Sequence, residues 1–211
     1  MKFKCVGRIA YRLIAFLLIL SCDNIVQKAT SDYFPFTEGN WWRYVSNNDT
    51  ILVEVEPADT ILQRECVPIS YGGAATYLVK DDEAISEYVK IIYNFSGTDY
   101  TVIENFIMRI ELPLINGNSY RDSLIDSLNI SGQWIRAKCQ INGVVSNTDY
   151  IDTLYSGDVY KIAIATCQNL ISPDTSIIDS TYVEEYYAPN IGLIRFVNTE
   201  GDYSLMEYEV Q

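Results

Sequence analysis

The sequence contains no histidine among its 211 residues, and this absence excludes more chemistry than any other feature of the composition. Histidine is the usual general base of serine and cysteine hydrolases and a common protein ligand for zinc, copper and haem iron. Phosphate-binding loops of the GxxxxGK and GxGxxG types are also missing from the sequence. We therefore expect a protein that is not an enzyme and that needs neither a cofactor nor a metal ion.

The lack of histidine does not exclude catalysis by carboxylates alone, because a glycosidase needs only two acidic side chains at a set separation. The candidate acids stand in charged runs, which are typical of solvated surface: Asp81, Asp82, Glu83, Glu184 and Glu185. Two polar segments could offer oxygen ligands to calcium, but neither has the spacing of an EF-hand: 47–50 and 199–202. A carboxylate-based hydrolase is therefore the least favoured of three hypotheses.

Long hydrophobic runs are also missing, since the most apolar segment covers only Leu13 to Leu20. A transmembrane helix needs about 20 apolar residues. Four basic residues precede the segment and a polar stretch follows it, which is typical of an export signal. The residues Ile19-Leu20-Ser21-Cys22 resemble a bacterial lipobox, which implies cleavage before Cys22 and lipidation of its thiol. An ordinary secretory signal with an incidental Cys22 is the alternative.

This interpretation divides the chain into a signal peptide (1–21), a lipidated cysteine with a polar tether (22–32) and one β-rich domain (33–211). Two or three acyl chains anchor a protein stably, so we expect a cell-envelope protein held at a bacterial membrane, on the periplasmic side or the surface. Without residues 1–21, 11 basic and 28 acidic residues remain, a formal net charge of −17. Such a charge disfavours nucleic acid as a partner and repels anionic headgroups.

Cysteine is scarce in the domain, which holds only Cys66, Cys139 and Cys167. At most one intramolecular disulfide can form among three thiols. Cys139 alternates with apolar residues, so we expect a buried, unreactive thiol there.

Helical periodicity is nearly absent, and 17 tyrosines accompany valine, isoleucine and threonine in short runs, as in strands. The segment Gln133 to Ile141 alternates strictly, which predicts a strand that buries Ile135, Ala137, Cys139 and Ile141. The segment 123–129 is the only candidate helix. We predict an all-β domain of about nine to eleven strands by this pattern, forming a curved antiparallel sheet, a half-barrel or an open barrel.

Hairpin turns are predicted at four places. Asn142-Gly143 is the strongest short signal, because a type I′ turn needs positive φ at both central residues. The segments 95–99 and 198–202 predict two further reversals. Pro189 suits the second position of a β-turn, and Asn190 tolerates the positive φ of the third.

One phrase occurs twice in the sequence: FPFTEGNWWR at 34–43 returns 78 positions later as LPLINGNSYR at 112–121. Each copy sets two apolar side chains beside a proline, turns at Gly-Asn and starts a strand that begins with an aromatic residue. We expect two pseudo-repeats starting near 34 and 112, with convergence as the alternative. The predicted structural turn residues, taken over all these signals, are Pro35, Gly39, Pro113, Gly117, Asn142, Gly143, Pro189 and Gly192.

Three motifs in the domain read Tyr33-Phe-Pro-Phe-x-x-Gly-Asn-x-Trp42, Leu112-Pro-Leu-x-x-Gly117 and Tyr186-Tyr-Ala-Pro-Asn-Ile-Gly-Leu193. Together they resemble a group of poorly characterised bacterial envelope lipoproteins with YFPL-x-x-GN-x-W and YYAP-x-x-GL motifs. The resemblance implies the curved half-barrel of the LolA-like and LppX-like lipoproteins, and it brings no catalytic residues. Tyr120 stands where the second motif often has tryptophan, and Asn190 where the third often has glycine.

Four aromatic residues are candidates for the floor of a ligand cleft, with core packing as the alternative: Trp41, Trp42, Tyr120 and Trp134. Trp41 and Trp42 must point to opposite faces of their strand. We expect a non-catalytic envelope lipoprotein that binds an apolar or lipid-like ligand or an envelope protein. A structural or assembly subunit of an envelope complex is the alternative.

Overall fold

The computed structural model describes residues 32–47 and 49–211, so the predicted signal peptide, Cys22 and most of the tether lie outside the described residues. Tyr33–Gln211 form one compact unit, which is described here by itself. None of the described residues belongs to a helix that is long and apolar enough to cross a membrane.

The described chain is all-β, as predicted from its composition, and its thirteen strands exceed the nine to eleven expected. The strands of the first half are β1 (Trp41–Ser46), β2 (Asp49–Val55), β3 (Asp59–Ile61), β4 (Arg64–Tyr71), β5 (Ala74–Lys80), β6 (Ala84–Phe95) and β7 (Thr98–Glu111). Those of the second half are β8 (Ser119–Ile130), β9 (Gln133–Ile151), β10 (Ser156–Ile171), β11 (Ser176–Ala188), β12 (Gly192–Val197) and β13 (Asp202–Glu209).

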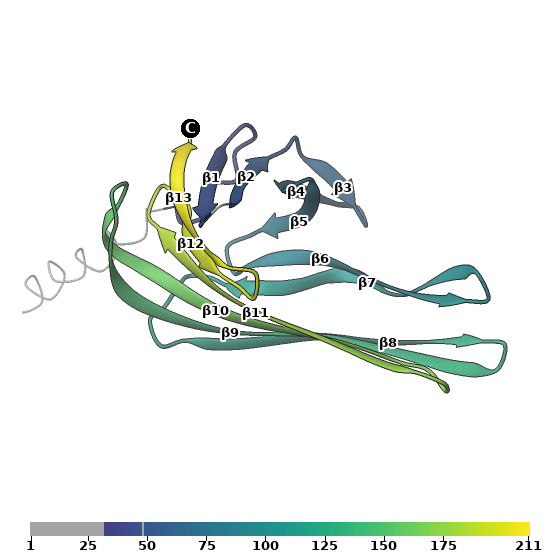
Figure 1. Ribbon diagram of the computed structural model, residues 1–211. Coiled ribbons are helices and arrows are strands. Elements are labelled where there is room, and N and C mark those ends of the chain that lie inside the picture. The colour runs from purple at the N-terminus through teal and green to yellow at the C-terminus, as the bar shows by residue number, and fades with distance from the viewer. Residues whose placement is uncertain (1–31, 48) are drawn as a thin grey trace, which may run out of the picture. The chain divides into compact units, whose positions relative to one another are not determined.

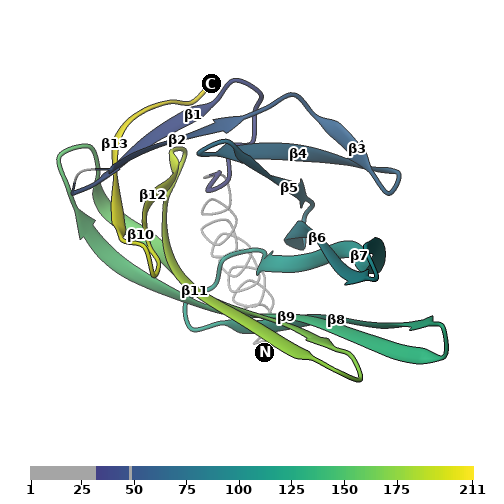
Figure 2. The same ribbon diagram turned by 45° about the vertical axis from the view of Figure 1, so that its right-hand side comes forward.

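Twelve of these strands form one antiparallel sheet in the order β7-β6-β5-β4-β2-β1-β13-β12-β11-β10-β9-β8, and β3 pairs with β4 beside it. Apart from β3, each half of the chain is therefore a meander, and the first strand β1 pairs with the last strand β13. The sheet curls until its two edges, β7 and β8, lie next to each other. Figure 2 shows the strands arranged as a nearly closed barrel. The predicted curved antiparallel sheet is confirmed.

The seam between β7 and β8 is joined by side chains, since no backbone ladder between these strands occurs in the described part of the chain. The Tyr120 hydroxyl donates to the Arg109 carbonyl oxygen (2.7 Å), and an Asp122 carboxylate oxygen accepts from the Met108 N–H (2.8 Å). Beyond these bonds the hairpins β6–β7 and β8–β9 run outward as separate arms (Figure 1). The barrel is therefore closed near its middle and open along the arms.

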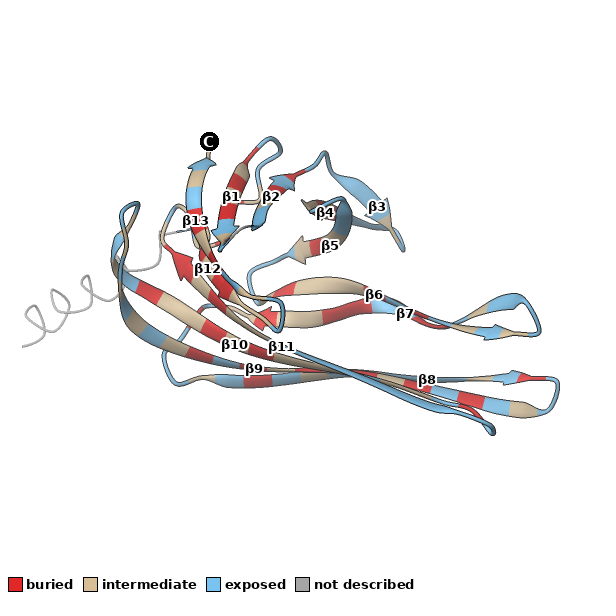
Figure 3. Ribbon diagram, in the orientation of Figure 1, coloured by how far each residue is buried: buried red, intermediate tan, exposed pale blue. Residues whose placement is uncertain are grey.

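Strict alternation decides which face of each strand is buried, as β9 shows (Figure 3). Ile135, Ala137, Cys139 and Ile141 are all buried, while the intervening side chains point outward. This confirms the strand predicted from Gln133 to Ile141, and it follows from the period of two in a pleated strand.

The helix predicted at 123–129 is wrong, because these residues belong to β8, which pairs with β9 from Ser119 to Ile130. Leu124 lies opposite Cys139 and Leu128 lies opposite Ile135, so both leucines face the core side. Pairing along the whole length of β9 outweighs the weak helical preference of a short segment.

The hairpin predicted at Asn142-Gly143 is also wrong, since β9 runs through both residues without a turn. Gly143 lies opposite Tyr120 of β8, and a Cβ atom on Gly143 would overlap the Tyr120 ring. The glycine therefore makes room for a cross-strand aromatic ring, and the chain does not need its freedom to adopt positive φ.

The other predicted turns are confirmed. Ser96 and Gly97 have φ angles of 51° and 82° and connect β6 to β7. Asn198 accepts two backbone hydrogen bonds in the turn between β12 and β13, and Asn190 has a φ of 61°.

The Gly-Asn turns in the two copies of the repeated phrase adopt the same local structure, although Leu112-Pro113 is a cis peptide bond and Phe34-Pro35 is not. The Gly39 N–H donates to the Val55 carbonyl oxygen (3.0 Å), and the Gly117 N–H donates to the Val145 carbonyl oxygen (2.9 Å). The φ angles of the two glycines are 85° and 84°. Each copy therefore makes a Gly-Asn turn that starts one six-stranded meander.

The three cysteines of the domain are free thiols. Cys139 faces the core, where burial raises the pKa of its thiol to about 11. Cys167 lies on the neighbouring strand β10 opposite Gln140, so it points to the other face of the sheet. The buried, unreactive thiol predicted at Cys139 agrees with this environment.

Candidate ligand-binding site

A pocket of about 310 Å³ lies inside the barrel, where the two hydrophobic clusters of the core meet. Its walls come from the segment before β1 and from seven strands. Aromatic and aliphatic side chains dominate the lining, and Arg109 and Glu185 are its only charged members. The lining residues are Tyr33, Phe34, Pro35, Phe36, Trp42, Tyr44, Val53, Ile69, Tyr71, Ala74, Thr76, Leu78, Arg109, Glu185, Tyr187, Gly192 and Leu193.

The first of the three sequence motifs supplies one wall, and hydrogen bonds hold it against the third. The Trp42 indole N–H donates to the Ile191 carbonyl oxygen (2.6 Å), and the Tyr44 hydroxyl donates to the Leu193 carbonyl oxygen (2.7 Å). Gly192 has a φ of 92°, and a Cβ atom there would lie 3.1 Å from Pro35. Two motifs whose contacting residues Trp42 and Ile191 lie 149 positions apart in the sequence therefore meet at this pocket.

Asn40 holds the same wall of the pocket in place through two hydrogen bonds. Its side chain is completely buried, its amide N–H donates to the Pro35 carbonyl oxygen (2.8 Å), and its amide oxygen accepts from the Gln211 N–H (3.0 Å). Both polar atoms of a buried amide are thus satisfied, which rigidifies the Tyr33–Phe36 segment.

The polar end of the pocket is a connected group of charges. Arg109 on β7 donates to Glu185 on β11 (2.5 Å) and to Glu87 on β6 (2.7 Å). The second Glu185 oxygen accepts from the Tyr187 hydroxyl (2.8 Å). Glu185 is 6% exposed, whereas the Arg109 side chain keeps 22% of its surface because it lines the pocket.

The pKa values follow from this burial. Burial alone would lower the pKa of Arg109, but the charges of Glu185 and Glu87 outweigh it and hold the pKa well above its usual range. Burial, followed by the charge of Glu185, raises the pKa of Tyr187 well above 10. The guanidinium is thus permanently charged and the Tyr187 hydroxyl is protonated.

This arrangement can bind a mainly apolar molecule that carries one polar group. One cation faces two carboxylates, so the polar end carries a surplus of negative charge and disfavours a free anionic head. Arg109 and the hydroxyl groups of tyrosine can instead orient an uncharged polar group by hydrogen bonds.

The predicted ligand-binding residues do not all gather at this site. Trp42 lines the pocket, but Trp41 faces outward, where its indole N–H donates to Glu209 (3.2 Å). Tyr120 is buried at the β7–β8 seam, and Trp134 is 64% exposed near the tip of the β8–β9 arm. The opposite orientations predicted for Trp41 and Trp42 are confirmed.

The charged residues of the pocket were not recognised in the sequence. Glu185 was assigned to solvated surface, which is wrong, because it faces the barrel interior between Val183 and Tyr187 on β11. Alternation along β11 could have revealed this. Glu184 does face outward and pairs with Lys161 (2.7 Å), and the acids at 81–83 are exposed between β5 and β6. The candidate acids therefore do not form one site.

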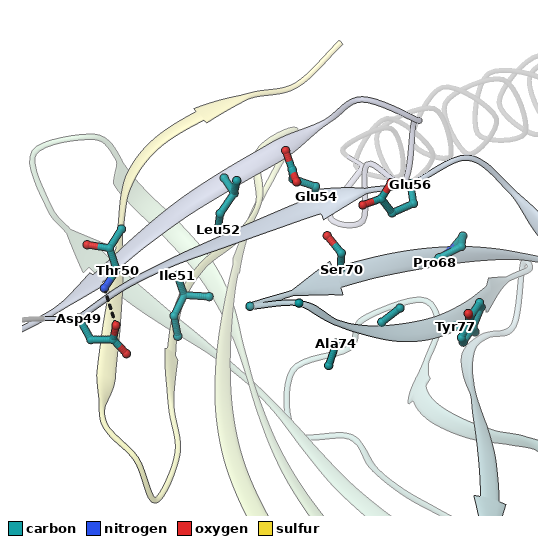
Figure 4. Close-up of a pocket in the computed structure, with 13 residues that line it drawn as sticks. Asp49, Thr50, Ile51, Leu52, Glu54, Glu56, Pro68, Ser70, Ala74 and Tyr77 are labelled. Carbon is teal, nitrogen blue, oxygen red and sulfur yellow. Dashed lines mark hydrogen bonds between the residues drawn. The ribbon is translucent and has the colours of Figure 1, made fainter.

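A second, larger hollow of about 950 Å³ lies between the first half of β2 and the β4–β5 turn. Figure 4 shows its lining, which includes Asp49, Glu54 and Glu56 and no basic side chain. Because β4 ends at Tyr71, opposite Val53, the first half of β2 has no strand partner on that side, and a polar groove remains there. Nothing in its lining points to a specific ligand.

No group of three or more metal-ligating acids or cysteines that could hold an ion occurs within residues 32–47 and 49–211. No protein-family model and no curated protein sequence matches the chain. A solved structure, described as a "putative exported protein with YmcC-like fold" from Bacteroides fragilis, matches with a TM-score of 0.38 and 14% identity. The match covers 85% of this chain and 99% of that chain. At this level of similarity, no property of that protein is assigned to the present chain.

Proposed function

We propose that the protein is a lipid-anchored cell-envelope protein that holds a lipid-like or other apolar molecule inside its barrel without catalysing a reaction. The observation that carries this proposal is the interior pocket, whose aromatic and aliphatic walls leave about 310 Å³ unfilled. Protein interiors are normally close-packed, so an apolar space of this size is unusual in a core that serves stability alone.

The size of the pocket restricts the ligand. Ligand sites usually occupy about 300–1,000 Å³, and this pocket lies at the lower end of that range. It suits a single acyl chain or a small ring system better than a lipid with two chains. Because Glu185 and Glu87 together outweigh the positive charge of Arg109, the polar end favours an alcohol, ester or amide head over a free carboxylate.

The proposed absence of catalysis rests on the polar groups of the pocket. Glu185 is engaged by Arg109 and Tyr187, so its carboxylate is held for structure and is poorly placed to act as a base. The sequence offers no histidine that could replace it.

The test is organic extraction and native mass spectrometry of the chain from residue 22 with Cys22→Ser, purified without detergent. We expect an apolar molecule to be recovered with the protein. Complete absence of a bound molecule would contradict the proposal and favour the structural or assembly subunit.

A pair of variants on β5 makes this test specific to the pocket. Thr76 lines the pocket, whereas Ala75 points to the outer face, so Thr76→Phe should fill the site and Ala75→Phe should not. We expect Thr76→Phe to raise the dissociation constant of the ligand about tenfold or more, which corresponds to a loss of about 1.4 kcal/mol of binding free energy, and so to lower its occupancy in the purified protein. Equal occupancy in the two variants would place the ligand elsewhere.

The proposed anchor is tested in the full chain. Cys22→Ser should release the protein from membranes or leave it unprocessed, because stable anchoring needs the acyl chains that the thiol and the freed amine would carry. Membrane fractionation and mass spectrometry of the mature N-terminus measure the effect. A Ser variant that remains bound with a mature N-terminus elsewhere would show that the lipobox interpretation is wrong.

A further inference from the structure

The outer face of the β8–β11 arm carries no acidic side chain in the four rows nearest its tip, in a chain with 28 acidic residues, and Glu184 faces outward in the next row. Strand registers place sixteen outward positions there in four rows of four. From the tip inward the rows are Ser127, Arg136, Ile171, Ser176; then Ile125, Lys138, Asn169, Ile178; then Ser123, Gln140, Cys167, Ser180; then Arg121, Asn142, Ala165, Tyr182. We call these sixteen positions, together with Trp134, the outer arm face.

Two cations in the two rows of the outer arm face that lie nearest its tip lack partners. Arg136 and Lys138 make no ion pair, hydrogen bond or aromatic contact with any described residue. All other cations in the described part of the chain have such a partner, as Arg121 does in Gln140 (2.6 Å). Unpaired cations are therefore concentrated on one face of a protein whose overall charge is strongly negative.

Apolar side chains surround these cations and remain exposed. Trp134 and Ile125 are each 64% exposed, Ile178 is 66% exposed and Ile171 is 44% exposed. Scattered exposed apolar residues are normal, but a group of this size on one face marks an interaction surface.

A hollow of about 460 Å³ lies between the two cations and the apolar residues, and its lining consists of Ile125, Asp126, Ser127, Arg136, Ala137, Lys138, Asn169 and Ile171. The carboxylate of Asp126, the one acid in this lining, accepts from the Ser127 N–H (2.7 Å), and the two cations outweigh its charge. The side-chain oxygen of Asn169 is buried and has no hydrogen-bond partner within the described residues. A buried acceptor without a partner costs free energy. A ligand that brings both a negative charge and a hydroxyl group would satisfy the cations and this oxygen together.

We propose that the outer arm face binds the surface of an anionic bilayer, with a phosphoglycerol headgroup in the hollow. Exposed tryptophan, aliphatic side chains and unpaired cations are the combination that interfacial membrane elements use. The net charge of −17 does not prevent this, because charges on other faces are screened beyond about 8 Å at physiological ionic strength. This face is separate from the pocket, so the proposal does not depend on the proposed function.

The test uses the chain from residue 22 with Cys22→Ser, once its cooperative melting has been shown. Co-sedimentation with phosphatidylcholine vesicles, with and without phosphatidylglycerol, measures binding. We expect binding only to the anionic vesicles, weakened by salt, with a blue shift of tryptophan emission that Trp134→Phe removes. Each cation near an anionic surface contributes enough that Arg136→Gln/Lys138→Gln should weaken binding about tenfold or more.

The matched control is Arg43→Gln/Lys90→Gln, which removes two cations that are similarly exposed but paired with Glu207 and Glu104. This double variant changes the net charge by the same amount as Arg136→Gln/Lys138→Gln, and it should leave vesicle binding unchanged. Equal weakening by both double variants, or no binding of the parent chain to anionic vesicles, would overturn the proposal. Binding to polyglutamate but not to vesicles would also overturn it, in favour of an acidic protein partner.

Discussion

Replacing Arg109 by methionine should lower the free energy of unfolding by about 3 to 5 kcal/mol, the cost of leaving a buried charge unpaired. Arg109 is the only described cation that contacts Glu185, and it also contacts Glu87. Because methionine keeps much of the side-chain volume, the loss of unfolding free energy comes mainly from the missing charge and less from altered packing. Urea unfolding followed by circular dichroism measures the change.

Two further variants distinguish the cost of removing the buried Arg109 charge from the cost of removing an ion pair at the surface. Arg43→Met removes a pair with Glu207 in which both side chains are substantially exposed, and it should cost about 1 kcal/mol or less. Arg109→Met/Glu185→Gln should recover part of the loss, because glutamine can still accept from Tyr187 without carrying a charge. Equal costs for Arg109→Met and Arg43→Met would contradict the buried arrangement.

Replacing Gly143 by alanine should destabilise the β7–β8 seam by about 1 to 3 kcal/mol, the usual cost of overpacking. The added methyl group would overlap the Tyr120 ring, which cannot move without losing its hydrogen bond to the Arg109 carbonyl oxygen. Thermal and urea unfolding measure this effect.

A double-mutant cycle with Tyr120→Ala provides the control. In the Tyr120→Ala background the ring is absent, so Gly143→Ala should cost much less than in the parent chain. An equal cost in both backgrounds would show that strain at Gly143 has another source.

The sequence predicts those parts of the fold that depend on local pattern. Alternation identified β9 and its buried face, and the residues 96–97 and 198–201 form turns because their own backbone and side chains favour them. The repeated phrase was visible because both of its copies need the same Gly-Asn turn.

The failures involve contacts between residues that are distant in sequence. Asn142-Gly143 has ideal hairpin chemistry, but Tyr120 on another strand requires a glycine in the extended strand there. The pocket charges were missed for a similar reason, since Arg109 and Glu185 are 76 residues apart and only the closed sheet brings them together. The residue type of Trp134 makes it a candidate for ligand binding, but its position at an arm tip places it outside the barrel.

The central claim is that the space beside Arg109 and Glu185 holds an apolar ligand, and a crystal structure tests it most directly. The protein should be purified without delipidation from the membranes of the cells that produce it. We predict continuous electron density of an acyl chain or small ring system between Trp42, Leu78 and Tyr187, with its polar end near Arg109. A pocket closed by inward movement of its own side chains, or one that contains only water, would contradict the claim.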